Sequence, residues 1–156
     1  MFRISKKGDY AVSLMCHLAT QGATRDADVV SAHDLADQSG LSRSMVANLL
    51  KELTKAGLLE STRGLHGGYR LAVDPEEISL GRILEVVEGP FLLVDCADDE
   101  GATDDEHQCN LLSSCRSRSP LRVLHQRIAH LMDETKLPEM ANSAMHLECS
   151  NQPPTL

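Results

Sequence analysis

Aromatic side chains are scarce in this chain of 156 residues, which contains no tryptophan, two phenylalanines and two tyrosines. Its core must therefore be built from aliphatic side chains, and a hydrophobic fraction of 42% is sufficient for one. No apolar run approaches the roughly 20 residues needed to cross a bilayer. The first ten residues also lack the apolar stretch of a secretory signal. These absences predict a cytoplasmic protein without a membrane partner.

The patterns of an enzyme are missing as well. The sequence contains no convincing nucleophile–base pair, no phosphate-binding loop and no paired catalytic carboxylates. The closely spaced thiols that reductase chemistry needs are also lacking. The sequence therefore predicts a protein that is not an enzyme and has no catalytic residues.

Basic residues are fewer than acidic ones over the whole chain: it contains 15 Lys and Arg and 23 Asp and Glu, which gives a net charge of −8. The excess of acid lies in the second half. Residues 1–73 contain nine basic and seven acidic side chains, whereas residues 74–156 contain six and sixteen. An evenly acidic protein would repel nucleic acid, but here a local basic surface remains. Any DNA-binding surface is therefore predicted in the first half.

Five cysteines, an odd number in a chain expected in the reducing cytoplasm, indicate metal binding or redox sensing more than a disulfide framework. Three of them, Cys96, Cys109 and Cys115, lie in one polar segment. That segment has too few apolar residues to form a packed core of its own. A metal ion or cluster held by thiolates is the interpretation that would order it.

Two short helices joined by a tight turn are predicted after a first helix over residues 4–20. Ser31 is a suitable cap for the first of the two, and Gly40 suits the left-handed position that ends it. Ser42 then caps a helix that ends at Ala56-Gly57. This arrangement is a helix-turn-helix.

The second of these helices has an apolar stripe, and the residues outside the stripe are suited to DNA. In DNA-binding proteins of this kind, the first turns of the second helix contact base edges in the major groove. Arginine pairs with guanine, asparagine pairs with adenine, and serine and lysine suit phosphates or bases. The alternative is an ordinary solvated helix face. The predicted DNA-binding residues here are Ser42, Arg43, Ser44, Asn48 and Lys51.

A β-hairpin is predicted directly after this helix, with strands around residues 58–62 and 69–73 and a glycine-rich turn between them. A hairpin in this place is the wing of a winged helix. We expect Arg63, His66 and Arg70 to surround its tip, where phosphates or a narrow minor groove attract cations. The alternative is a hairpin with a purely structural role.

The second half is predicted to contain two more helices. Ser79 caps the first, which ends at Gly89-Pro90, and Ser119-Pro120 begins the second. The second helix carries an apolar stripe with a 3.5-residue period, which suits either a coiled-coil-like dimer contact or packing on its own domain. We expect His125, which lies on this helix, to be solvated. The stripe consists of Leu121, Leu124, Ile128 and Leu131.

We therefore predict a mainly α fold for the whole chain. It consists of a winged helix-turn-helix over 1–75, a connecting helix and sensor loop over 76–118, a dimerisation helix over 119–137 and a polar tail over 138–156.

With these elements in order, the chain resembles the IscR/NsrR (Rrf-type) family of winged-helix transcriptional regulators over about residues 2–137. The segments that carry the likeness are residues 4–12 (ISKKGDYAV), 41–46 (LSRSMV), 63–71 (RGLHGGYRL) and 79–84 (SLGRIL), together with the cysteine segment. Members of this family are homodimers that bind palindromic promoter DNA. The resemblance implies a transcriptional regulator, and we expect a repressor.

Many members hold an iron–sulfur cluster on three cysteines, and the resemblance assigns that role to Cys96, Cys109 and Cys115. IscR-like members add a histidine at the position where this chain has Arg118, which cannot ligate a metal. NsrR-like members use an aspartate from the partner subunit, and Asp9 stands at that position. The resemblance is therefore closer to the NsrR branch. It favours a 4Fe-4S over a 2Fe-2S cluster and implies sensing of nitric oxide, redox state or iron–sulfur status.

Other interpretations of the cysteine segment remain open. His107 is a rival ligand, since three thiolates and one histidine can also hold a tetrahedral zinc ion. Twelve residues, many of them acidic, separate Cys96 from Cys109, which is longer than usual in the family. The alternatives are a cluster-free winged-helix regulator, or an interaction module, with thiol or zinc chemistry at the cysteines.

Overall fold

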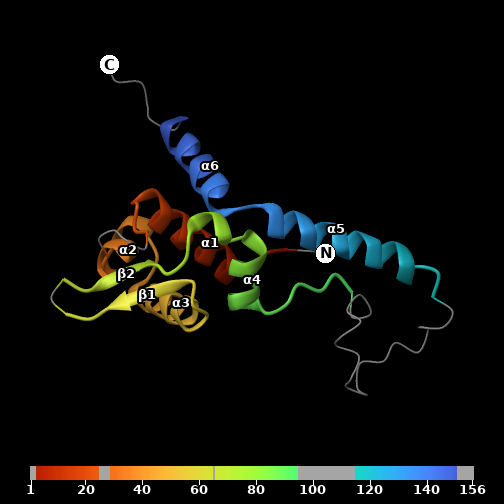
Figure 1. Cartoon of the computed structure of the whole chain (residues 1–156), viewed down its shortest axis with the longest axis horizontal. Helices are drawn as coiled ribbons and strands as arrows, with labels where there is room; N and C mark the ends of the chain where they lie inside the picture. Colours follow the sequence, from red (N-terminus) through yellow and green to blue (C-terminus); the bar gives the residue numbers. More distant parts are fainter. Residues whose placement is uncertain (1–2, 25–28, 65, 95–114, 151–156) are drawn as a thin grey trace.

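Figure 1 shows the computed structural model of the chain, which describes residues 3–24, 29–64, 66–94 and 115–150. Seven elements lie within residues 6–88, and two further helices follow from residue 118 onward. They are α1 (Lys6–Thr20), α2 (Ala32–Ser39), α3 (Arg43–Lys55), β1 (Leu59–Thr62), β2 (Gly68–Leu71), the 3-10 turn η1 (Pro75–Glu77), α4 (Leu80–Glu88), α5 (Arg118–Glu134) and α6 (Leu137–Ser150). The predicted fold class, mainly α with a winged helix-turn-helix and a long C-terminal helix, is confirmed.

Serine hydroxyls begin four of the helices, and they fix where each helix starts. Each hydroxyl accepts a hydrogen bond from the amide three residues later, which satisfies one of the unpaired donors of the first turn. The predicted caps Ser31, Ser42 and Ser79 are confirmed. Ser5, which caps α1, is a fourth. Gly40 has a φ of +67°, as the turn between α2 and α3 requires.

The hairpin is tied to the helix-turn-helix through a short backbone ladder. β1 and β2 pair antiparallel, with Leu59 opposite Leu71 and Thr62 opposite Gly68. On the other side of β2, the amides of Val30 and Tyr69 each donate to the other residue's carbonyl, over 2.9 and 2.8 Å. A side chain at Gly68 would place its Cβ 2.5 Å from the Val30 carbonyl oxygen. Glycine is therefore required for this close approach.

The core is aliphatic, as the composition predicted. Figure 1 shows α1 in the middle of the molecule, with α4 and α6 packed on it. Side chains from the helices and the hairpin meet there with no exposed area. They are Leu14, Met15, Leu18, Leu35, Val46, Leu49, Leu50, Leu53, Leu71, Ile78, Ile83 and Leu137. We refer to α1–α4 with the hairpin as the head. In the part of the chain that the structure describes, no helix is both long and apolar enough to cross a membrane.

The C-terminal helices correct three expectations. α5 begins at Arg118, so Ser119 lies inside its first turn; the residue before the helix is Ser117, whose side chain makes no capping bond. A helix, α6, stands where a polar tail was expected, because Leu137 and Ala141 are buried in the core at one-turn spacing. The ring of His125 is not simply solvated. It stacks on Phe91 with ring centroids 5.2 Å apart.

Candidate nucleic-acid interface and sensor residues

The two faces of α3 differ completely in exposure. Val46, Leu49, Leu50 and Leu53 are fully buried and fix the rotation of the helix about its axis. The opposite face is solvent-exposed, and it carries the five DNA-contacting residues that were predicted for this helix: Ser42, Arg43, Ser44, Asn48 and Lys51. The hydrophobic core therefore presents a polar, positively charged row as one rigid surface.

Arg43 is the first residue of α3, and its guanidinium is held by two residues of α2. Its Nη2 atom lies 3.4 Å from His33 Nε2 and 3.9 Å from Asp37 Oδ1. His33 Nδ1 in turn lies 3.2 Å from Asp37 Oδ2, one helical turn away on α2. The arginine side chain remains 72% exposed, so most of its five donors can still reach a ligand.

His33 and Asp37 were missed by the sequence analysis. Their four-residue spacing on a helix was visible, because such residues share one face. Their proximity to Arg43 was not visible, since it depends on the angle between α2 and α3. The structure thus adds two residues that orient the first side chain of α3.

Ser42 is exposed, and it also caps the start of α3. Its hydroxyl accepts from the Met45 amide over 3.3 Å and lies 3.3 Å from the Ser44 hydroxyl. A side chain that caps the helix in this way is held in one orientation. It can therefore offer its remaining bonding capacity in a fixed direction.

The wing residues do not share one location. Arg63 and His66 are exposed in the turn between β1 and β2, as predicted. Arg70 is a correction, because it lies within β2, directly opposite Glu60, rather than at the tip. Its Nη2 is 3.2 Å from Glu60 Oε1, and its side chain is 27% exposed. The charge of Arg70 is therefore largely compensated within the hairpin.

The predicted sensor residues are only partly within the described residues. Asp9 is exposed in the first turn of α1, and Cys115 is a half-buried free thiol just before α5. Cys96, Cys109 and His107 lie outside the described residues. Within the described ranges, no three His, Cys, Asp or Glu side chains come together as a metal site. The structure therefore places Asp9 and Cys115 but does not assemble the whole predicted set.

Cys16 is a different kind of thiol. It lies in the core with 7% of its surface exposed, and burial raises its pKa from 9.0 to about 11. A thiol that stays protonated is a poor nucleophile and a poor metal ligand. Cys16 is therefore a packing residue.

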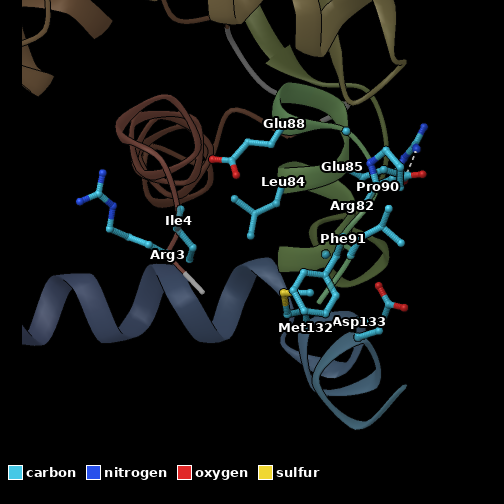
Figure 2. A pocket seen from close by; sticks show the side chains of 14 residues that line it. Arg3, Ile4, Arg82, Leu84, Glu85, Glu88, Pro90, Phe91, Met132 and Asp133 are labelled. Atoms are coloured by element: carbon cyan, nitrogen blue, oxygen red, sulfur yellow. Dashed lines mark hydrogen bonds and ion pairs between the residues drawn. The ribbon is translucent and has the colours of Figure 1, made fainter. Parts of the chain in front are cut away.

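A cleft of about 460 Å³ lies between the start of α1, α4 and α5 (Figure 2). Ile4, Leu84, Phe91 and Met132 supply its apolar lining. Charged side chains surround them, namely Arg3, Arg82, Glu85, Glu88 and Asp133. The cleft borders the end of α4, where the chain turns at Gly89 and Pro90 towards the cysteine segment.

Comparisons with known proteins agree on one class. The sequence profile of the Rrf2 family, described as an iron-dependent transcriptional regulator, matches residues 4–143. The transcriptional regulator IscR of Aliivibrio salmonicida is 31% identical over 138 residues, covering 88% of this chain and 76% of that protein. The regulator NsrR of Bacillus licheniformis is 26% identical over 145 residues, covering 93% and 96%. These relatives are transcriptional regulators and not enzymes, as the sequence predicted.

Solved structures give the same result. The chain is similar to CymR, the global cysteine regulator of B. subtilis, with a TM-score of 0.70 and 27% identity over 92% of this chain and 98% of that one. It is also similar to T. potens IscR, with a TM-score of 0.67 and 28% identity over 99% and 94%.

Proposed function

This chain belongs to the Rrf2 family of transcriptional regulators, and we propose that it is a homodimeric repressor whose affinity for promoter DNA is set by an iron–sulfur cluster. As a member of this family it is a DNA-binding regulator. The observation that carries the proposal is the exposed row on α3, which a buried opposite face holds in place.

In the proposed complex, α3 enters the major groove with its first turn at the base edges. Arg43 donates to a guanine and Asn48 pairs with an adenine, because these side chains match the edges of those bases. Lys51 and Arg63 neutralise phosphates. His66 is exposed in the same turn of the hairpin as Arg63, and in this complex it contacts the DNA backbone.

The surface of α5 supports the homodimer. Val123 and Leu124 are 45% and 46% exposed, and Leu131 is 63% exposed. Figure 1 shows α5 extending away from the head, at the end of the molecule opposite the wing. An apolar row of this kind on a projecting helix suits the same row of a second copy. Two heads joined in this way reach two half-sites about one helical turn or more apart.

The donor chemistry fits an iron–sulfur cluster. Three thiolates, from Cys96, Cys109 and Cys115, are the ligands that such clusters prefer. Asp9 has a carboxylate that is exposed on α1 and so available to a second subunit, which favours a 4Fe-4S over a 2Fe-2S cluster on the NsrR pattern. When bound, the cluster supplies a centre that reacts with nitric oxide and oxidants. If Asp9 were a ligand of that cluster, it would tie the first turn of α1 to the cysteine segment of the second subunit, and loss of the cluster would remove this tie.

A second candidate is a regulator without a cluster, whose cysteines respond as thiols. It is favoured by the likeness to CymR, because one CymR structure is described as a cysteine regulator and another, from Staphylococcus aureus, as an oxidized form. Zinc held by the three thiolates and His107 is a variant of this candidate.

Anaerobic purification separates these candidates. We expect a coloured protein that contains iron and acid-labile sulfide but no zinc. Removing the cluster should then change the mobility-shift affinity for a promoter fragment. A colourless protein without either metal contradicts the cluster, and equal affinities of the cluster-bound and cluster-free proteins contradict the sensing mechanism.

A further inference from the structure

Three helices meet on one side chain, that of Lys7 in the first turn of α1. Its ammonium donates to the Val87 carbonyl oxygen near the end of α4, over 2.9 Å. The same nitrogen lies 2.8 Å from Glu52 Oε2 on α3. Lys7 therefore links the end of α4 to the recognition helix.

Each of these bonds has a physical reason. The Val87 carbonyl is in the last turn of α4, where carbonyls lack a partner within the helix and attract a cation. Glu52 follows Lys51 on α3, so its carboxylate is carried by the helix that presents the DNA-facing row. An ion pair on the surface alone contributes little. Here the cation is held from both sides, and both ion-pair side chains are 39% exposed.

A second set of contacts makes the end of α4 and the start of α1 one unit. Glu88 Oε1 accepts from the Ser5 amide over 3.0 Å and from the Ser5 hydroxyl over 2.6 Å. A side chain at Gly8 would collide with the Glu88 carboxylate and with Leu84. Figure 2 shows Glu88 and Leu84 extending from α4 towards α1. A shift of the end of α4 must therefore carry the first turn of α1 with it.

We propose that Lys7 is a positioning residue for DNA recognition, which holds α3 in register with the joined ends of α1 and α4. The inference deepens the proposed function and rests on it. Gly89 and Pro90 follow α4 and precede the cysteine segment in the sequence, while Asp9 lies two residues after Lys7 on α1. Lys7 therefore lies where a change at either sensor element reaches the recognition helix.

The test uses the full chain and two DNA probes. One is the 30-base-pair fragment that the wild-type protein selects from a random double-stranded library, and the other is a scrambled fragment of equal length. We expect Lys7→Met to weaken binding to the selected fragment by about tenfold, as the loss of a charge-assisted hydrogen bond implies. Binding to the scrambled fragment should change less than twofold. Lys7→Arg should restore most of the affinity.

Lys6→Met is the matched control, since it removes the same charge from the neighbouring residue. Lys6 is exposed and has no hydrogen bond or ion pair among the described residues. It should change binding less than twofold. The dependence of affinity on salt should keep its slope in Lys7→Met, because a positioning residue releases no counterions from DNA. A slope smaller by about one would make Lys7 a phosphate contact and overturn the inference.

Two further variants test the connection itself. Glu52→Gln should weaken binding to the selected fragment, and its effect should not add to that of Lys7→Met. Glu88→Gln, which loosens the joint of α1 and α4, should behave in the same way. Additive losses, or a Lys7→Met protein that binds within twofold of wild type, would overturn the inference. A wild-type protein that selects no sequence would instead contradict the proposed function, and thermal unfolding of each variant excludes loss of the fold.

Discussion

The head and α5 are stabilised in opposite ways. In the head, apolar faces are buried against each other and all four α-helices have a serine cap with a bonded hydroxyl. On α5, Met132 is the one buried residue, three large apolar side chains are exposed, and Ser117 makes no capping bond. The head contains the contacts that determine its shape. The helix α5 exposes the apolar side chains that a second copy covers in the proposed dimer.

The largest expected effect comes from the core beneath the recognition helix. Leu50→Ala should lower the free energy of unfolding by about 2–5 kcal/mol, because it leaves a cavity in a fully buried site. Leu131→Ala, on the exposed face of α5, should cost less, and its cost should disappear on dilution to monomer. Urea denaturation followed by circular dichroism at several protein concentrations measures both. Equal, concentration-independent losses would contradict the distinction between head and α5.

Thiol reactivity gives the next largest contrast. At pH 8, the raised pKa of Cys16, about 11, leaves about a hundredfold less thiolate than the ordinary value of 9.0 would give. In protein treated with chelator, iodoacetamide should therefore modify the half-buried Cys115 well before Cys16, as peptide mass spectrometry can show. In guanidinium the rates at which iodoacetamide modifies Cys16 and Cys115 should become similar. A difference that persists there would contradict burial as the cause of the low reactivity of Cys16.

The raised pKa of Cys16 also affects stability. Because the thiol ionises more easily in the unfolded chain, the free energy of unfolding should fall as the pH rises from 9 towards 11.

A smaller effect is expected from the contrast between Arg43 and Arg70 in DNA binding. Arg43→Ala should cost about 1–3 kcal/mol and relax the preference at one base pair, because the exposed guanidinium reads a base edge in the proposed complex. Arg70→Ala should cost less than about 1 kcal/mol, since Glu60 already neutralises Arg70. Fluorescence anisotropy on the selected fragment and its single-base variants measures both. Equal losses from the two substitutions would show that Arg70 also contacts DNA.

The smallest effect concerns the helix caps. Ser31→Ala should destabilise the protein by about 1 kcal/mol, because the Ser31 hydroxyl accepts from the Asp34 amide over 3.1 Å. Ser117→Ala should change the stability by less than about 0.5 kcal/mol, since that hydroxyl makes no capping bond. Thermal unfolding of the two variants at one protein concentration is the measurement. A larger loss for Ser117→Ala would mean that the start of α5 is capped after all.

Local rules were enough to predict much of the head. The caps Ser31, Ser42 and Ser79, the turn at Gly40 and the apolar face of α3 all follow from residues within one or two helical turns of each other. The order of the elements followed from the same local signals, and the family resemblance rested on that order. Features of this kind depend on short-range spacing, which a sequence displays directly.

The missed features depend on distances that the sequence does not display. The partner of Arg70 is set by the register of the hairpin, and the approach of His33 and Asp37 to Arg43 is set by the angle between two helices. The helix α6 was missed although Leu137 and Ala141, which pack into the core, are spaced one helical turn apart in the sequence. For the candidate site, the α3 row was predicted, whereas the connection through Lys7 required the structure.

The backbone ladder between Val30 and Tyr69 has a consequence for the behaviour of the protein at high concentration. It covers the outer side of β2, so among the described residues only β1 offers an open strand edge. That edge is four residues long, and Glu60, Ser61 and Thr62 along it are exposed and polar. Short, polar edges resist strand addition by neighbouring molecules. The wing can therefore project from the head, as the proposed DNA contact requires, without pairing with the strands of neighbouring molecules.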